Sequence, residues 1–428
     1  MASPLSLLLP LLFLLSSTST SATDLPIHHV NRRLPSSPLD SALFLARSDS
    51  SRLSLLLSQK TSPYHNIPLG SGQQMLNTPS YVVRASLGSP AQPLLLSLDT
   101  SSDAAWVPCS PCSDCPSSTL FLPSNSTSYS SLQCASTWCP LFTGAPCSDP
   151  NTATTTPCSY MQSVGDSSFT AALAQETLQL AQDAIPNFAF GCVNSFTGNT
   201  ANLPKQGLLG LGRGPMSLLS QTGNMYGGVF SYCLPSYKSY YFSGSLRLGP
   251  VGQPKSIRYT PLLKNPHRPS LYYVNLTGIS VGKVNVKVPP NSFNFDTLVG
   301  QGTVVDSGTV ITRFTAPVYA ALRDEFRRQV SAPNGYSSLG AFDTCFSTND
   351  VAQAPSITLH MDALDLTLPM ENSLIHSSAT PLACLAMAEA PANVNQVVNV
   401  IANLQQQNMR VVIDVANSRV GFARELCN

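Results

Sequence analysis

The sequence predicts a mostly β protein made of two related lobes. Short runs rich in β-branched and other apolar residues, separated by Gly and Pro, recur from Thr78 to the end of the chain. Helical spacing is convincing only over residues 315–331, with apolar residues at every fourth position (318, 322, 326 and 330). Two similar aspartate-bearing stretches, SLDTSSDAAWVPC (97–109) and TVVDSGTVITRF (303–314), lie in the two halves. A length of 428 residues suits two domains or one bilobal unit.

The N-terminus has the pattern of a signal peptide. Residues 1–22 contain a Leu-rich run from Leu5 to Leu15, followed by small residues. This run is too short to span a membrane, and we identify no second apolar run of membrane-spanning length. We therefore expect a secreted, extracellular protein without a membrane anchor.

Residues 23–77 form a mildly basic segment that we expect to be removed. Five basic residues outnumber three acidic ones: Arg32, Arg33, Arg47, Arg52 and Lys60 against Asp24, Asp40 and Asp49. Two interpretations remain open: an ordinary amphipathic helix, or an inhibitory prosegment whose cations neutralise acidic catalytic residues. We assign 23–77 as the prosegment, 78–252 as the N-terminal lobe and 253–428 as the C-terminal lobe.

Cysteine usage agrees with export. The chain has twelve cysteines, an even number, and six disulfides are expected in an oxidising compartment. The spacing of Cys109, Cys112 and Cys115 raises a metal alternative, but a nearby His or second close Cys pair is missing. We therefore expect no metal. The sequons at Asn125 and Asn275 are candidate glycosylation sites.

The charge balance argues against a nucleic-acid partner. Net charge is +1, and only 11% of residues are charged.

Among the expected strands are 80–88 and 93–100, a β-rich stretch over 271–288, and a hairpin over 409–423 that turns at residues 416–419.

An internal repeat links the two halves. Asp99 is followed by GLLGLG (207–212), and Asp306 is followed by VIANLQ (400–405), so each half pairs an aspartate-bearing turn with a later apolar segment. Two carboxylates held close share one proton, because like charges repel at short range. The ionised member can deprotonate a water between them, and the protonated member can polarise a peptide carbonyl. This chemistry requires no cofactor.

Each carboxylate is followed by residues suited to fix it. Thr100 and Ser102 follow Asp99, and Ser307, Gly308 and Thr309 follow Asp306, so a hydroxyl stands three positions on in both halves. A turn can place that hydroxyl against the carboxylate.

These motifs resemble the pepsin-family aspartic proteases, in particular the plant nepenthesin-like type, over residues 78–428. The stretches AAWVPCSPC, GLLGLGRGPMSLLSQ, FSYCLP and NLQQQNMRVVIDVANSRVGFA also match, and the saposin-like insert of some plant members is absent.

The resemblance implies a bilobal fold with a substrate cleft, a flap, zymogen processing and an acidic optimum. It implies Asp99 and Asp306 as catalytic pair, a peptide or protein substrate, a monomer, and an apoplast or cell-wall location. It further implies the bridges Cys345–Cys384, Cys233–Cys427, Cys139–Cys147 and Cys134–Cys158. The remaining cysteines are Cys109, Cys112, Cys115 and Cys192.

The sequence departs from the family pattern at two places. Ser101 stands at a position where Gly is usual. Gly is favoured there because a Cβ crowds an amide that must approach the carboxylate. In the flap segment around Gly165 and Asp166, Val164 occupies the usual Tyr position. Val cannot hydrogen-bond towards Trp106, so we expect Trp106, in the cleft, to find another partner.

Three other functions compete with the peptidase interpretation. A binding or inhibitor-like protein on the same fold is favoured by Ser101 and Val164, and a structural wall protein leaves the paired aspartates unexplained. A serine hydrolase lacks the Gly-x-Ser-x-Gly motif, and His267, His360 and His376 show no evident Ser and Asp partners in the sequence.

Overall fold

The computed structural model describes residues 66–142, 147, 153–164, 166–201, 203–330, 332–377, 380–391 and 397–427. The predicted signal peptide and residues 23–65 of the predicted prosegment lie outside the described residues. The chain divides into two compact units, 1–60 and 61–428, and the architecture below belongs to the second.

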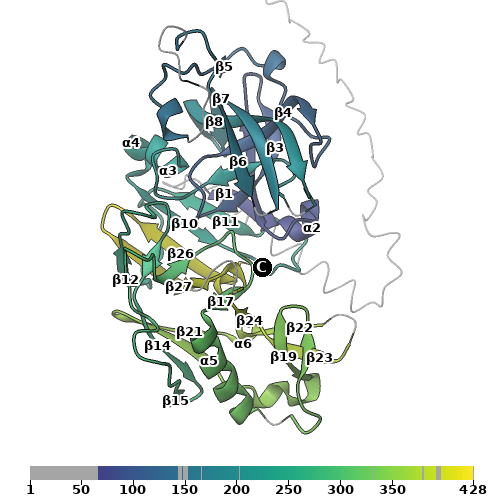
Figure 1. The fold of residues 1–428 in the computed structure, drawn as a ribbon, viewed down its shortest axis with the longest axis vertical. Coiled ribbons are helices and arrows are strands. Elements are labelled where there is room, and N and C mark those ends of the chain that lie inside the picture. The colour runs from purple at the N-terminus through teal and green to yellow at the C-terminus, as the bar shows by residue number, and fades with distance from the viewer. Residues whose placement is uncertain are drawn as a thin grey trace, which may run out of the picture. The chain divides into compact units, whose positions relative to one another are not determined.

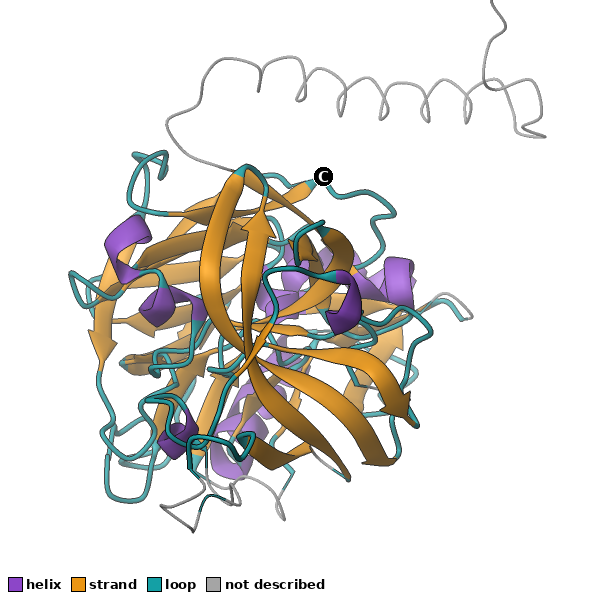
Figure 2. Ribbon diagram, turned by 90° about the horizontal axis from the view of Figure 1, so that it is seen from above, coloured by secondary structure: helices purple, strands orange, loops and turns teal. Residues whose placement is uncertain are grey.

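The second unit is mostly β, as predicted (Figure 2). The strands of its first half are β1 (Asn66–Ser71), β2 (Tyr81–Leu87), β3 (Gln92–Asp99), β4 (Trp106–Ser113), β5 (Ser130–Ser131), β6 (Ser159–Val164), β7 (Ser167–Leu180), β8 (Asp183–Gly198), β9 (Leu208–Gly210), β10 (Val229–Cys233) and β11 (Gly244–Leu248). Those of the second half are β12 (Arg258–Leu263), β13 (Tyr273–Val274), β14 (Leu276–Val281), β15 (Val284–Asn285), β16 (Gly302–Val305), β17 (Thr312–Phe314), β18 (Ser337–Leu339), β19 (Phe342–Ser347), β20 (Ile357–Met361), β21 (Leu364–Leu368), β22 (Leu374–His376), β23 (Leu382–Leu385), β24 (Met387–Glu389), β25 (Val398–Ile401), β26 (Met409–Asp414) and β27 (Arg419–Arg424).

Within the described residues helices are few, and the predicted one is the longest. They are α2 (Gly72–Leu76), α3 (Leu218–Gln221), α4 (Gly223–Tyr226), α5 (Ala316–Gln329) and α6 (Met370–Ser373), with 3-10 turns η1 (Pro123–Asn125), η2 (Cys139–Leu141), η3 (Thr348–Gln353) and η4 (Asn403–Gln406). Helix α5 confirms the prediction for 315–331: Val318, Leu322 and Phe326 recur on one face and are all buried.

An antiparallel sheet joins the two halves. Its order is β1, β11, β10, β26, β27, β12, and β10 pairs with β26 across the boundary between the halves. Figure 1 shows these strands between β3, β4 and β6–β8 at one end and α5, β14 and β15 at the other. The β26–β27 pair confirms the predicted hairpin, with Asp414 opposite Arg419 and a turn over 415–418.

The internal repeat is a repeat of strand pairing. In the first half β9 runs parallel to β3 and antiparallel to β4, and in the second half β25 runs parallel to β16 and antiparallel to β17. Asp99 lies opposite Gly210, and Val305, just before Asp306, lies opposite Ile401. Each aspartate therefore lies at the end of a strand that pairs in parallel with the strand of the later apolar segment.

Strand β1 lies within the predicted prosegment, yet it is part of the fold. It pairs with both β2 and β11, and Ile67 and Leu69 are fully buried. The sequence sets the boundary between prosegment and mature chain at residue 77, and this boundary stays a prediction. A cut there would remove β1 and its contacts from the fold.

All twelve cysteines are in disulfides, as predicted. Cys345–Cys384 and Cys233–Cys427 are the expected pairs. The other two were wrong, because the structure pairs Cys134 with Cys147 and Cys139 with Cys158. The sulfurs of Cys134, Cys139 and Cys147 all lie within 4.8 Å of one another, so residue spacing could not distinguish the alternatives. The remaining bridges are Cys109–Cys192 and Cys112–Cys115.

Within the described residues, every helix is too short or too polar to cross a bilayer.

Candidate active site

Asp99 ends strand β3, where the chain turns sharply. Its Oδ1 accepts hydrogen bonds from the backbone N and the hydroxyl of Ser101, both at 2.7 Å. Its Oδ2 accepts from the hydroxyl of Ser102, three positions on, at 2.7 Å. The loop is anchored to the repeat segment, since Leu211 N donates to Asp99 O and Gly212 N to Ser102 O.

Asp306 has a matching environment at the end of β16. Its Oδ1 accepts from Gly308 N at 3.0 Å, and its Oδ2 accepts from the N and hydroxyl of Thr309 at 3.1 and 2.6 Å. Asn403 N donates to Thr309 O, as Gly212 N does to Ser102 O in the first half. The two carboxylates are thus held by the same local construction.

The structure brings the two aspartate loops into contact. Thr100 Oγ1 donates to Asp306 Oδ1 at 3.3 Å and accepts from Ser307 N at 2.9 Å. Asp99 faces Gly308 so closely that a Cβ there would lie 2.6 Å from Asp99 Oδ1. Only glycine fits at position 308, because any side chain would collide with the Asp99 carboxylate.

The electrostatics distinguish the two carboxyl groups. Asp306 is 6% exposed, whereas Asp99 is partly exposed. Burial, and then repulsion from Asp99, raise the pKa of Asp306 to about 6, against the opposing hydrogen bonds from Thr309, Gly308 and Thr100. The Asp99–Asp306 pair therefore holds a shared proton in mildly acidic solution.

A cavity of about 280 Å³ opens beside the pair and is lined from both halves of the chain. The first half contributes Thr100 and Ser101. The second half contributes Asp306 and mainly apolar residues, namely Leu271, Tyr272, Val304, Val305, Val397, Val398 and Val400, together with Arg268. An extended peptide with one side chain in this cavity would pass beside Asp306.

The segment predicted as the flap forms the β6–β7 hairpin, in which Val164 pairs with Ser167. Val164 is partly buried against an apolar cluster, and Asp166 is exposed at the tip. Gly165 lies outside the described residues.

Trp106 was expected in the cleft, but the structure buries it. It is 2% exposed, and its ring packs on Phe169 and Phe196 with centroids 4.9 and 5.9 Å away. These rings are its packing neighbours, and the expectation of another hydrogen-bond partner stays a prediction. Tyr160 is also buried, stacked on Phe142, so it does not replace a flap tyrosine.

Sequence reasoning overlooked Asp103, which links the Asp99 loop to the second half. Its Oδ1 accepts from Gly214 N at 2.8 Å, and its Oδ2 accepts from the Ser270 hydroxyl at 2.6 Å. Side chains on Gly210 and Gly212 would clash with Asp103 or its neighbour Ser102. The Gly-rich spacing of 207–214 was the signal that a close approach occurs here.

The expectation about histidines was wrong for His360. Its Nδ1 lies 2.7 Å from Asp365 Oδ1 and its Nε2 lies 2.6 Å from Ser280 Oγ, because strands β14, β20 and β21 are adjacent. Ser280 is 6% exposed and donates its proton to Asn285 Oδ1 at 2.6 Å. A hydroxyl committed in this way is not available as a nucleophile, so the three residues form a cross-strand link.

The two sequons differ in accessibility. Asn125 is exposed in η1, whereas Asn275 is half-buried between β13 and β14 and its Nδ2 donates to Asp362 Oδ2 at 2.9 Å.

Comparison with known proteins agrees with this geometry. Family models described as "Xylanase inhibitor N-terminal" and "Xylanase inhibitor C-terminal" match residues 81–250 and 271–424. The chain is 66% identical to "Aspartyl protease 25" of Oryza sativa subsp. japonica over 94% of both chains, and 55% identical to "Aspartyl protease AED3" of Arabidopsis thaliana over 99% of this chain and 98% of that one. It is 36% identical to "Aspartic proteinase nepenthesin-1" of Nepenthes gracilis over 88% of this chain and 83% of that one.

The chain belongs to the nepenthesin-like, pepsin-family aspartic proteases. Among solved structures, "Crystal structure of edgp" has a TM-score of 0.68 at 20% identity, covering 86% of this aspartic protease homologue and 96% of that chain. The soybean structure "Crystal structure of Basic 7S globulin" has a TM-score of 0.66 at 21% identity, covering 84% and 97%. At these identities the two structures establish the pepsin-like fold and nothing further.

Proposed function

We propose that this protein is an aspartic endopeptidase that hydrolyses peptide bonds at acidic pH with a water activated between Asp99 and Asp306. The observation that carries this proposal is the contact between the two aspartate loops, in which Thr100 bonds both Asp306 and Ser307 N. Asp99 accepts the proton of the water as it attacks the peptide carbonyl, and protonated Asp306 stabilises the developing negative charge on the carbonyl oxygen. The proton taken up by the pair then goes to the leaving nitrogen.

The support groups have defined parts in this proposal. Ser102 and Thr309 hold the outer carboxylate oxygens, and Gly308 N holds the inner oxygen of Asp306. The cavity beside Asp306 receives a substrate side chain, and its valine-rich wall favours apolar atoms.

The decisive experiment is cleavage of peptides by the purified, processed protein between pH 3 and pH 7. We expect cleavage that pepstatin inhibits and that Asp99→Asn and Asp306→Asn each reduce by at least about a thousandfold, because neither carboxylate acts alone. Absence of cleavage throughout this range, with a folded protein shown by circular dichroism, would refute the proposal.

A second candidate is a binding or inhibitor-like protein with little or no catalysis on the same fold. The specific observation in its favour is the Ser101 hydroxyl, which donates to Asp99 Oδ1 at 2.7 Å and so competes with the water for that oxygen. Asp306→Ala separates the two candidates, since a protease loses its activity whereas a binding protein retains its ligand.

We also propose a secreted monomer that acts in the apoplast or cell wall. The Leu-rich N-terminus and the six disulfides support export. A fluorescent fusion of the full chain tests location, since retention inside the cell contradicts it. Light scattering of the secreted protein tests the monomer.

A further inference from the structure

The cavity beside Asp306 combines apolar walls with a single cation. Among the described residues that line it, Arg268 is the one basic side chain, and Asp306 is the one acidic side chain. Arg268 is exposed, whereas Val304 and Val398 on the wall are buried. A substrate side chain that fills the cavity would therefore meet apolar atoms along its length and a guanidinium at the rim.

A rigid turn presents this arginine. Asn265 is fully buried, and its Oδ1 accepts from the backbone N of His267 and of Arg268, while Leu271 N donates to Arg268 O. The guanidinium lies along Gly300, where a Cβ would be 2.7 Å from Cζ. Arg268 is therefore positioned by its backbone and by this contact.

The same turn is attached to the loop that carries Asp99. The Ser270 hydroxyl donates to Asp103 Oδ2 at 2.6 Å, and Arg213 N donates to Ser270 O. The backbone turn that carries Arg268 is thus tied to the loop that carries Asp99.

The guanidinium has no carboxylate partner within the described part of the chain. None of the ion pairs there includes Arg268. The sequence of residues 392–396, which precede Val397 on the cavity wall, contains no Asp or Glu. Arginine stays ionised at every pH relevant to the protein and forms bidentate bonds with carboxylates, so an incoming carboxylate is its natural partner.

We propose that Arg268 is a specificity-determining residue that selects substrates with a glutamate side chain at the position occupying this cavity. The two methylene groups of glutamate pack on the valine wall, and its carboxylate pairs with the guanidinium. Glutamine has the same shape without the charge and gains only the apolar part. The inference rests on the proposed peptidase function and names the substrate class of the same site.

The test uses peptides that differ only by Glu or Gln, substituted in turn at each of three positions on either side of the cut. At pH 5.5 we expect one position at which the Glu peptide has a kcat/KM about threefold to tenfold above that of the Gln peptide, as for a partly exposed ion pair. In Arg268→Gln this ratio falls to about one, and in Arg268→Lys part of it remains. Lys264→Gln, an exposed charge on the same segment that does not line the cavity, keeps both the ratio and the basal rate.

The pH dependence of the ratio provides a second readout. A glutamate side chain has a pKa near 4.3, so the preference should fade below about pH 4 as the peptide carboxyl becomes protonated, while the Gln peptide is still cleaved. Equal rates for Glu and Gln at every position, or a preference that survives in Arg268→Gln, would overturn the inference alone. Failure to cleave any peptide would instead refute the proposed function, and this inference with it.

Discussion

At the scale of single residues, Ser101 sets the difference between the two aspartate loops. Gly308 offers only its backbone N–H to Asp306 Oδ1, whereas Ser101 adds a hydroxyl to its backbone N–H at Asp99 Oδ1. The Ser101 hydroxyl hydrogen-bonds Asp99 Oδ1, the oxygen that must contact the water in the proposed reaction. The substitution thus leaves the carboxylate well ordered but partly occupied.

Ser101→Gly should therefore raise kcat/KM for peptide cleavage by about tenfold. The reason is that the variant frees Asp99 Oδ1 from a hydrogen bond to a charged group, a contact worth about 1.5–3 kcal/mol, while the Ser101 backbone N–H bond remains. Steady-state kinetics at pH 4–6 measure this, with Ser101→Ala as the control for loss of the hydroxyl alone. A fall in rate in both variants would show that the hydroxyl assists the reaction.

Asp306 should control the alkaline limb of activity. Since burial and Asp99 raise its pKa to about 6, the pair loses its shared proton above that pH, and the rate should fall about tenfold per pH unit. The same shift affects stability. The folded state binds this proton more tightly than the unfolded state, so the stabilisation is present below about pH 4 and is lost as pH rises through 6.

The stability effect is on the order of 2–3 kcal/mol, from a pKa that moves from 3.8 to about 6. Urea unfolding at pH 4 and pH 7 of the native chain and of Asp306→Asn measures it. The variant should show a smaller loss between the two pH values, because its amide does not titrate. Parallel losses in both proteins would contradict a raised pKa at Asp306.

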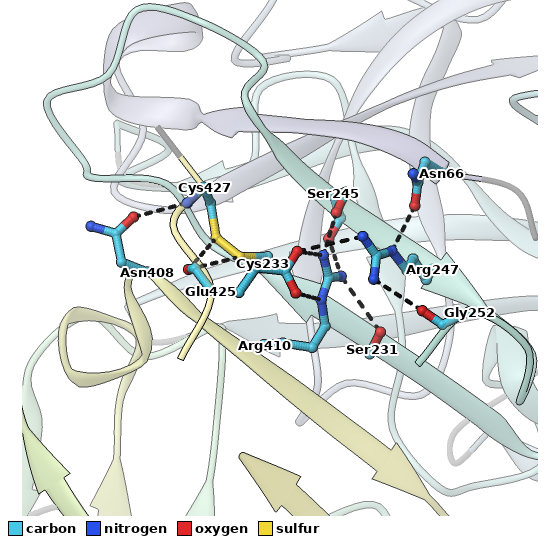
Figure 3. Close-up of polar contacts among 10 residues, drawn as sticks. All are labelled: Asn66, Ser231, Cys233, Ser245, Arg247, Gly252, Asn408, Arg410, Glu425 and Cys427. Carbon is cyan, nitrogen blue, oxygen red and sulfur yellow. Dashed lines mark hydrogen bonds and ion pairs between the residues drawn. A yellow bond between two sulfur atoms is a disulfide. The ribbon is translucent and has the colours of Figure 1, made fainter. Parts of the chain in front are cut away.

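At the scale of elements, an ion pair between buried Arg410 on β26 and Glu425, the residue after β27, ties the C-terminal segment to the antiparallel sheet that joins the two halves. Arg410 is fully buried, and its Nε and Nη2 donate to the two oxygens of Glu425 at 3.0 and 2.5 Å (Figure 3). Nη2 also donates to Ser245 Oγ on β11, and Arg247 contacts the same carboxylate. The disulfide Cys233–Cys427 lies beside this cluster.

Glu425→Gln should destabilise the protein by about 3 kcal/mol, because it leaves the Arg410 guanidinium buried without a counter-ion. Burial opposes ionisation of Glu425, but the hydrogen bonds and charge of Arg410, aided by Arg247, outweigh it and lower its pKa. This stabilisation is present above pH 4.5 and is lost as pH falls through the lowered value, so it persists at mildly acidic pH.

Thermal unfolding at pH 6 and pH 3 tests this, with Glu371→Gln as the control, since the pair of Glu371 with Arg424 is exposed and 3.8 Å apart. The difference in Tm between the native chain and Glu425→Gln should be larger at pH 6 than at pH 3. An equal difference at both pH values would argue against a charge effect.

The two sequons lie on elements of different accessibility, and they should differ in occupancy. Asn125 on η1 is exposed, whereas Asn275 is half-buried with Nδ2 bonded to Asp362. Glycopeptide mass spectrometry of the secreted protein should find a glycan on Asn125 and an unmodified Asn275. Glycosidase treatment should change the gel mobility of the native chain. Asn125→Gln should abolish this mobility change, and Asn275→Gln should leave it as in the native chain.

Local motifs and their repetition made much of this structure predictable. The apolar strand, the Asp and the hydroxyl three positions later are consecutive in sequence, so the surroundings of Asp99 and Asp306 followed from short-range geometry. Helix α5 was predictable because its buried face recurs at helical spacing. The pairing of Cys134 and Cys139 was not, because clustered sulfurs offer several closures. Nor were Arg268 and the His360 link, since strand neighbours that are distant in sequence create them.

At the scale of the whole molecule, strand β1 bears on the predicted boundary of the prosegment. A mature chain beginning at Thr78 would lack β1 and α2, and with them the buried side chains of Ile67 and Leu69. Each is worth about 1.5–3 kcal/mol of burial, in addition to the ladder hydrogen bonds with β2 and β11. Arg247 Nε also donates to Asn66 Oδ1 at 2.8 Å, which anchors the start of the strand (Figure 3).

We therefore expect the processed protein to begin at or before Asn66, upstream of the boundary that the sequence suggested. N-terminal sequencing or top-down mass spectrometry of the secreted form gives the answer directly. Two secreted variants, starting at Asn66 and at Thr78, provide a functional check, and the shorter one should unfold at lower temperature because β2 and β11 are left with open edges. The expectation would be wrong if the secreted protein began at Thr78 and if the variant starting at Thr78 were as thermally stable as the one starting at Asn66. The antiparallel sheet that joins the two halves would then be stable without β1.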